Sequence, residues 1–229
     1  MEIRAHTDQH YEGELKELHL KLLEMGGFVE KQITNAIIAL TDRNDDLARL
    51  TIERDHMANR MDVEIDELCL RLLALHQPAA RDLRLITTAL KITVDLERIG
   101  DMAVNLSERV LELNVEPQLK PYIDLPRMAD IAQAMLRESL NAFVHGDVDL
   151  ALKVCRDDDR IDDLTKQLFR ELLSYMAEDA QAIGRAIRLV FIAKYLERIA
   201  DHATNIAEMV VFMVKGKSIR HLDVVPPSV

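Results

Sequence analysis

The chain of 229 residues contains 48% hydrophobic and 30% charged residues, so it can bury a sizeable core in one large domain or in two of roughly 100 residues each. Its 29 basic and 40 acidic residues give a net charge of -11, which argues against a broad contact surface for nucleic acid or anionic lipid and favours metal cations or basic protein surfaces. No apolar stretch is long enough to span a membrane, and the N-terminus lacks the apolar core of a signal peptide. We therefore expect a cytoplasmic protein without membrane insertion.

Six long helices are predicted, because prolines are few and the stretches between them are rich in Leu, Ala, Glu, Arg and Met. Pro78 can occupy the first turn of the third helix, while Gly146 and Gly216 follow the expected ends of two others. The pair Gly26-Gly27 inside the first helix indicates a kink or a close approach of another helix. The expected helices span residues 8–43, 45–75, 79–113, 122–145, 147–177 and 181–215.

An internal duplication relates the two halves of the chain. The segment from Glu97 to Glu108 recurs one hundred positions later, at 197–208, and in both copies it follows a heptad-like apolar series. Short connections make neighbouring helices antiparallel, so each half is expected to form a three-helix bundle. The predicted fold is all-α, with two tandem three-helix bundles in an elongated molecule. Its parts are a first bundle in 1–114, a linker in 115–121, a second bundle in 122–216 and a tail in 217–229, where Pro226 and Pro227 argue against a helix.

Acidic residues occupy matching positions on two helices of each half. In each copy of the repeated segment a Glu and an Asp lie one helical turn apart, and an Asn follows one turn later. On the preceding helix two Asp residues are also one turn apart, in segments that align with an offset of 96. Because these positions flank the apolar seam, the two pairs in each half can face each other across a groove between antiparallel helices. The residues are Asp62, Asp66, Glu97, Asp101 and Asn105 in the first half, and Asp158, Asp162, Glu197, Asp201 and Asn205 in the second.

Clusters of four carboxylates favour a bound cation. Like charges one turn apart destabilise a helix by about 0.2 to 0.5 kcal/mol per pair, and a cation removes that repulsion. Oxygen ligands favour Mg²⁺, Mn²⁺ or iron over a structural Zn²⁺. Two other interpretations stay open. The carboxylates can be solvated helix faces, and Asp101 and Asp201 can form ordinary ion pairs with Arg98 and Arg198.

Signatures of catalysis are weak. The Glu-x-x-His motif of di-iron bundles occurs at Glu53 to His56, without a partner in the other half. Met102 occupies the position that matches His202, so we interpret His202 as an exposed helix residue. The sequence contains no Gly-rich phosphate loop and no nucleophile elbow. We expect no enzymatic activity; the alternative is a carboxylate-cluster metalloenzyme, and a third interpretation is a structural scaffold with unoccupied acidic grooves.

The chain resembles the PhoU family of accessory proteins of phosphate-specific transport systems. The resemblance rests on ERIGDMAVN at 97–105, ERIADHATN at 197–205, the acidic pairs before them, Met25-Gly26-Gly27, QPAARDLR at 77–84 and VKGKSIRH at 214–221. It implies two PhoU-type bundles whose Glu/Asp-x-x-x-Asp motifs bind metal ions or clusters through the eight carboxylates given above. Asn105 and Asn205 are candidates for an additional role. One departure is Ala200 where the first copy has Gly100, because its methyl group is expected to tighten the local space and make the two sites differ in metal occupancy.

The same resemblance implies a regulator that is not an enzyme. Proteins of this family repress the phosphate-starvation response when phosphate is plentiful, acting through the transporter's ATPase and the sensor histidine kinase PhoR, and they restrain phosphate uptake. They commonly form homodimers and can be peripheral to the membrane through the transporter. The expected function is therefore that of a metal-binding signalling adaptor with these two protein partners and no nucleic-acid partner.

Overall fold

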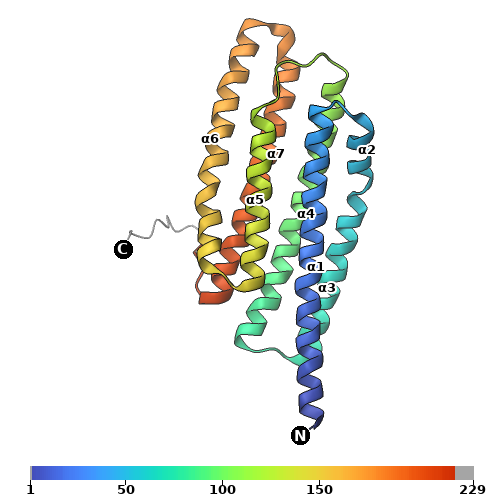
Figure 1. Ribbon diagram of the computed structural model, residues 1–229, viewed down its shortest axis with the longest axis vertical. Coiled ribbons are helices and arrows are strands. Elements are labelled where there is room, and N and C mark those ends of the chain that lie inside the picture. Colours follow the sequence, from blue (N-terminus) through green and yellow to red (C-terminus); the bar gives the residue numbers. More distant parts are fainter. Residues whose placement is uncertain (1, 220–229) are drawn as a thin grey trace, which may run out of the picture.

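The computed structural model describes residues 2–219, with side chains described from His10 onward, and this part of the chain contains helices and no strands. The expected all-α architecture of two tandem helical bundles is confirmed (Figure 1). No helix within residues 2–219 has both the length and the apolar composition needed to cross a bilayer. Residues 220–229, with the two prolines of the predicted tail, lie outside the described residues. The elements are α1 Glu2–Thr41, α2 Asp45–Glu53, α3 Asp55–His76, α4 Ala80–Asn114, α5 Asp124–His145, α6 Val148–Glu178, the 3₁₀ helix η1 Ala180–Ala182, and α7 Ile183–Lys215.

The second expected helix, over residues 45–75, is in fact two helices, α2 and α3, which meet at Arg54. In a continuous helix the Thr51 carbonyl would accept from the N–H of Asp55. Here the buried Gln32 of α1 donates its side-chain amide to the same carbonyl at 2.9 Å. The Arg54 N–H still donates to the Leu50 carbonyl, the ordinary hydrogen bond of an α-helix, so α2 is regular up to the break. Because the competing donor comes from another helix, the sequence of the segment alone does not reveal the break.

The ends of the other helices follow local chemistry. Gly146 and Gly216 end α5 and α7 in the left-handed conformation, with φ angles of 64° and 68°, as the sequence predicts. Asp147 then begins α6, since its carboxylate accepts a hydrogen bond from the Leu150 N–H at 2.9 Å. Pro78 lies in the connection before α4 rather than in its first turn, because the helix begins only at Ala80.

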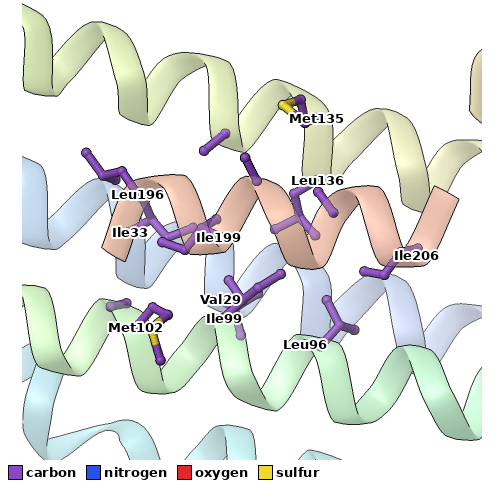
Figure 2. Packing of buried hydrophobic residues seen from close by; sticks show 14 of the residues in the cluster. Val29, Ile33, Leu96, Ile99, Met102, Met135, Leu136, Leu196, Ile199 and Ile206 are labelled. Atoms are coloured by element: carbon purple, nitrogen blue, oxygen red, sulfur yellow. The ribbon is translucent and has the colours of Figure 1, made fainter. Parts of the chain in front are cut away.

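The two halves, α1–α4 and α5–α7, lie side by side with their helices along the long axis of the molecule (Figure 1). Between the halves, α4 packs against α7 and α1 packs against α5, and each of these pairs joins equivalent helices of the duplication. Figure 2 shows side chains from both halves meeting in one layer, among them Val29 and Ile99 from the first half and Leu136 and Ile199 from the second. The two bundles therefore share one continuous hydrophobic core.

The heptad-like seams of α4 and α7 form the centre of this core. Leu96 and Ile99 on α4 are fully buried, and so are Leu196 and Ile199 on α7. The predicted core positions are confirmed here, because the alternating steps of three and four residues keep one face of each helix against its neighbours. The acidic residues beside these positions are consequently held at the edges of the core.

Gly26 marks a close approach between α1 and α5, whereas α1 runs through both glycines without a break. A methyl group on Gly26 would overlap the Cδ1 atom of the buried Leu140 of α5. A methyl group on the neighbouring Gly27 would meet no atom within 4 Å. Of the two alternatives that the glycine pair indicates, the close approach is therefore the one that forms.

Replacing these two glycines should have opposite effects on stability. We expect Gly26→Ala to lower the free energy of unfolding by about 1–2 kcal/mol, because Leu140 must leave its packed position and this outweighs the gain in helix propensity. The matched control Gly27→Ala should raise the free energy of unfolding by about 0.5–1 kcal/mol. Urea unfolding followed by circular dichroism measures both, and equal effects of the two variants would contradict the close approach.

Candidate functional site

The first acidic group consists of Asp62 and Asp66 from α3 and Glu97 and Asp101 from α4, two helices that pack against each other. Burial raises the pKa of Asp62, and the neighbouring carboxylate of Asp66 raises it further. Burial likewise raises the pKa of Glu97, with repulsion from Asp101 on its own helix and from Asp62 across the groove. The fold thus brings the two acidic pairs close enough to repel each other. The charge of Asp55 at the start of α3 also raises the pKa of Glu97, and Asp55 does not belong to the motifs found in the sequence.

The second acidic group consists of Asp158 and Asp162 from α6 and Glu197 and Asp201 from α7. Burial, followed by the carboxylates of Asp201 and Asp162, raises the pKa of Asp158 to about 6. Loss of hydration beside the surrounding protein raises the pKa of Asp201, and repulsion from the carboxylates of Glu197 and Asp162 raises it further. The Oδ1 atom of Asp158 and the Oγ1 atom of Thr204 on α7 are both buried, and the Thr204 hydroxyl lowers the pKa of Asp158 through a hydrogen bond to its carboxylate. This neutral donor does not offset burial and the repulsion from Asp201 and Asp162, because the pKa of Asp158 stays raised.

Basic side chains neutralise only part of each acidic group. In the first group Arg98 donates from Nη1 to Asp101 Oδ2 at 3.1 Å, so the ordinary ion pair that was one interpretation of Asp101 does form. In the second group Lys194 binds Glu197 at 2.6 Å and Lys166 approaches Asp162 at 3.7 Å. These pairs lie at the protein surface, where such contacts are worth at most about 1 kcal/mol. Among the described residues no ion pair forms at Asp62, Asp66, Asp158 or Asp201.

The donor atoms suit a hard cation in kind, but the present side-chain positions do not form a closed metal cage. All eight side chains offer carboxylate oxygens, which Mg²⁺, Mn²⁺ and iron accept. Within residues 10–219, no three His, Cys, Asp or Glu side chains are arranged so that they could hold a metal ion. The mutual repulsion of the carboxylates therefore supports a bound cation, and the coordination geometry does not.

Asn205 and His202 lie at the contact between α4 and α7 rather than in the second acidic group. The Nδ1 atom of His202 is 2.7 Å from Asp95 Oδ1, and Asn205 donates to the same oxygen at 3.4 Å. The His202 side chain is only 17% exposed, so its interpretation as an exposed residue is wrong. The physical reason is that α4 of the other half covers it. The side chain of Asn105 is half-buried and forms no hydrogen bond with another described residue.

A difference between the two copies could have revealed this contact. In the first half Met102 stands at the position of His202, and in the second half Tyr195 stands at the position of Asp95. The aspartate thus occurs only in the first copy and the histidine only in the second, and these two residues contact each other. Two polar residues that break the repeat at complementary positions are a signal for an asymmetric contact between the halves.

The first half has room for a methyl group at Gly100. It would lie 3.6 Å from Ala58 Cβ and 3.7 Å from Val29 Cγ1, which are ordinary van der Waals distances. The expectation that the methyl group of Ala200 makes the two sites differ in metal occupancy stays a prediction. The two groups do differ in their basic neighbours, which are Arg98 in the first and Lys194 with Lys166 in the second.

An apolar groove of about 240 Å³ between α6 and α7 borders the second acidic group. Phe169 in its wall is 46% exposed, and Leu173, one turn further along α6, is 44% exposed. The equivalent positions in the first half are Leu73 and Gln77, so the duplication does not repeat this surface. The groove is lined by Asp162, Thr165, Lys166, Leu168, Phe169, Leu172, Val190, Ala193, Lys194 and Glu197.

Comparisons with known proteins agree with this architecture. The family model described as "PhoU domain" matches residues 22–110 and 125–210, one match in each half. A Pseudomonas aeruginosa protein named phosphate-specific transport system accessory protein PhoU homolog is 43% identical over 218 residues, which cover 95% of this chain and 90% of the relative. The crystal structure of PhoU from Pseudomonas aeruginosa aligns with a TM-score of 0.86 at 43% identity, over 90% of this chain and 100% of that one. The phosphate transport system regulatory protein PhoU from Streptococcus pneumoniae aligns with a TM-score of 0.85 at 31% identity, over 91% of this chain and 98% of that one.

Neutralising Asp158 should stabilise the metal-free protein in a way that depends on pH. Its pKa is raised to about 6 from the usual 3.8, so the folded protein holds the proton more tightly than the unfolded chain does. The stability that this proton provides is present below about pH 4 and is lost as the pH rises through 6. Asn does not ionise, so we expect Asp158→Asn to exceed the wild type at pH 7 by on the order of 1–3 kcal/mol of unfolding free energy, a difference that vanishes towards pH 4.

Chemical denaturation in the presence of a chelator, repeated from pH 4 to pH 7.5, measures this difference. The matched control is Asp130→Asn on α5, an exposed carboxylate without a contact to another described side chain. Its effect should stay within about 0.5 kcal/mol at every pH. A wild type more stable than Asp158→Asn at pH 7 would contradict the assigned repulsion.

Proposed function

Because the chain belongs to the PhoU family, and the relatives above are named accessory or regulatory proteins of phosphate transport, we propose that it is a non-enzymatic adaptor of phosphate regulation. In this proposal it represses the phosphate-starvation response and restrains phosphate uptake when phosphate is plentiful. It does so by linking the ATPase of the phosphate transporter to the sensor histidine kinase PhoR. We place it in the cytoplasm, because ATP, the substrate of both partners, is cytoplasmic.

The observation that carries the adaptor proposal is the apolar groove between α6 and α7. Exposed aromatic and aliphatic side chains beside a charged rim are typical of surfaces that bind another protein. Phe169 is the exposed aromatic side chain of the groove, and the exposed Leu173 follows it one turn later on α6. Lys166 and Lys194 lie with Asp162 and Glu197 among the lining residues. A volume of about 240 Å³ suits one or two side chains of a protein partner better than a whole small substrate.

We also propose that each acidic group binds one or more hard metal ions, with Mg²⁺, Mn²⁺ or iron preferred over Zn²⁺. The support is the repulsion within both groups, which contributes to the raised pKa values of Glu97 and Asp158. A bound cation would supply positive charge that offsets this repulsion and ties α3 to α4 and α6 to α7. Such a role is structural or regulatory and includes no chemical step.

The repression of phosphate-starvation genes tests the adaptor proposal. Deleting the chain should leave a reporter of these genes active in phosphate-rich medium, and the wild-type chain should restore repression. The variant Phe169→Ser/Leu173→Ser should fail to restore it, because it removes the exposed aromatic side chain of the groove and the exposed leucine beside it. The matched control Val63→Ser/Leu70→Ser changes two exposed side chains of α3, 54% and 61% exposed, and should restore repression as the wild type does.

Binding measurements separate this outcome from unfolding. The purified groove variant should keep its helical circular dichroism spectrum while losing capture of the transporter ATPase or of the cytoplasmic part of PhoR. In light scattering, both variants and the wild type should have the mass of a homodimer, twice 26.1 kDa, which is part of the proposal. Normal repression in the deletion strain would sink the adaptor function.

Elemental analysis of the purified protein tests the metal proposal. Glu97→Gln/Asp101→Asn and Glu197→Gln/Asp201→Asn should each lose the metal of one half, and the combined variant should lose both. These substitutions keep the shape of the side chains and remove their charge. The exposed pair Glu12→Gln/Glu17→Gln on α1 is the control and should retain the wild-type content. Equal metal content in the wild type and in the three carboxylate variants would exclude these carboxylates as ligands.

A further inference from the structure

A second pocket, whose lining residues differ from those of the acidic groups, lies at the end of the molecule where α4 begins and α5 and α7 end (Figure 1). Its volume is about 460 Å³, within the range of sites for small ligands. It joins the two halves, because α1 and α4 contribute one wall and α5 and α7 the other. The lining residues are His19, Arg81, Arg84, Leu85, Phe143, Val144, His145, Gly146, Met213 and Val214.

The charge of this pocket is opposite to that of the chain. Its polar side chains are two arginines and two histidines, and no Asp or Glu of the described residues lines it, although the net charge of the chain is -11. The two nearest acidic residues in sequence are occupied elsewhere. Asp82 accepts a hydrogen bond from the Tyr11 hydroxyl at 3.2 Å, and Asp147 accepts from the Leu150 N–H at 2.9 Å. The pocket therefore presents donors to a ligand without a competing carboxylate.

Arg81 and Arg84 stand three positions apart on the first turns of α4, so their side chains share one face of the helix. Arg84 donates from Nε to the Met213 carbonyl at 2.9 Å, a contact that holds the guanidinium and satisfies a carbonyl at the end of α7. Its two terminal nitrogens make no hydrogen bond to another described residue. The side chain of Arg81 forms no ion pair or hydrogen bond within the described part of the chain, and it is exposed where it lines the pocket.

His19 provides an independent sign of a missing ligand. Its Nε2 atom is buried and has no hydrogen-bond partner among the described residues, while its ring packs edge-on against Phe143 with 5.3 Å between centroids. Burial lowers the pKa of His19 and so favours the neutral ring, which has a single N–H donor. On the other wall, His145 Nδ1 donates to the Asn141 carbonyl at 3.0 Å, so the Nε2 atom of His145 can donate to an anion only in the imidazolium form, which a bound anion favours.

From this arrangement we propose that the pocket binds a phosphoryl oxyanion, either inorganic phosphate or the phosphate group of a small metabolite. The planar guanidinium groups of Arg81 and Arg84 match the oxygens of phosphate in paired hydrogen bonds. Donors that come from both walls suit the three or four oxygens of a tetrahedral anion better than the two of a carboxylate. The bound anion would bridge the two halves, since Arg81 and Arg84 belong to the first and His145 to the second. This inference goes beyond the adaptor function and does not rest on it.

Isothermal titration calorimetry of the full chain in a phosphate-free buffer with chelator tests the site, with inorganic phosphate and AMP as the probes. We expect saturable binding of at least one probe with a dissociation constant below roughly 1 mM. Arg81→Ala should weaken it at least tenfold, and Arg81→Lys should weaken it less, because it keeps the charge but loses the fork. Arg127→Ala, which removes an exposed arginine at the opposite end of α5 without a contact to another described side chain, should leave binding unchanged.

The two probes distinguish the sources of the anion. Equal or tighter binding of inorganic phosphate identifies the free ion as the ligand, and much tighter binding of AMP identifies a phosphorylated metabolite. Arg84→Gln serves as a second variant, with its melting temperature recorded because the Met213 contact is weakened. Absence of saturable binding for both probes, or equal affinity of wild type and Arg81→Ala, would overturn the proposal.

Discussion

The contact between α4 and α7, the two copies of the repeated helix, is the constraint on which the rest of the structure depends. Leu96 and Ile99 on α4 are fully buried, as are Leu196 and Ile199 on α7. Burying one such side chain stabilises the fold by about 1.5–3 kcal/mol. Each seam packs against helices of its own bundle and also contributes to the contact with the other bundle. Separating the halves would therefore expose apolar surface on both. The duplication has thus produced one cooperative core from two similar bundles.

This shared core explains how the chain tolerates two groups of mutually repelling carboxylates. The acidic residues sit immediately beside seam residues, so the helices that pack the core also press the carboxylates together. The raised pKa values of Asp62, Glu97, Asp158 and Asp201 record that cost. The several seam side chains buried beside each group together outweigh this cost, and a cation would remove part of it. Packing therefore supplies the force that keeps the charges in place without requiring a closed metal cage in the unliganded chain.

The two halves have kept the core and diverged at their surfaces. The contact of His202 with Asp95 has no equivalent between Met102 and Tyr195, and Leu73 and Gln77 stand in the first half where the second has Phe169 and Leu173. The basic pocket joins the start of α4 to the ends of α5 and α7, and these are not equivalent positions in the repeat. The proposed anion site is therefore separate from the apolar groove, whereas the groove shares Asp162 and Glu197 with the second acidic group.

The sequence by itself determined the all-α fold, the duplicated seams and the pairing of Asp62 and Asp66 with Glu97 and Asp101, because helical periodicity is a local property that residue spacing records. Only the tertiary structure decided the break at Arg54, the burial of His202 and the collection of two arginines and two histidines in one pocket. In each case the decisive neighbour lies on a helix distant in the chain: Gln32 at the break, Asp95 at the histidine, and four different helices around the pocket. Spacing along one helix carries no information about which side chains another helix brings to it.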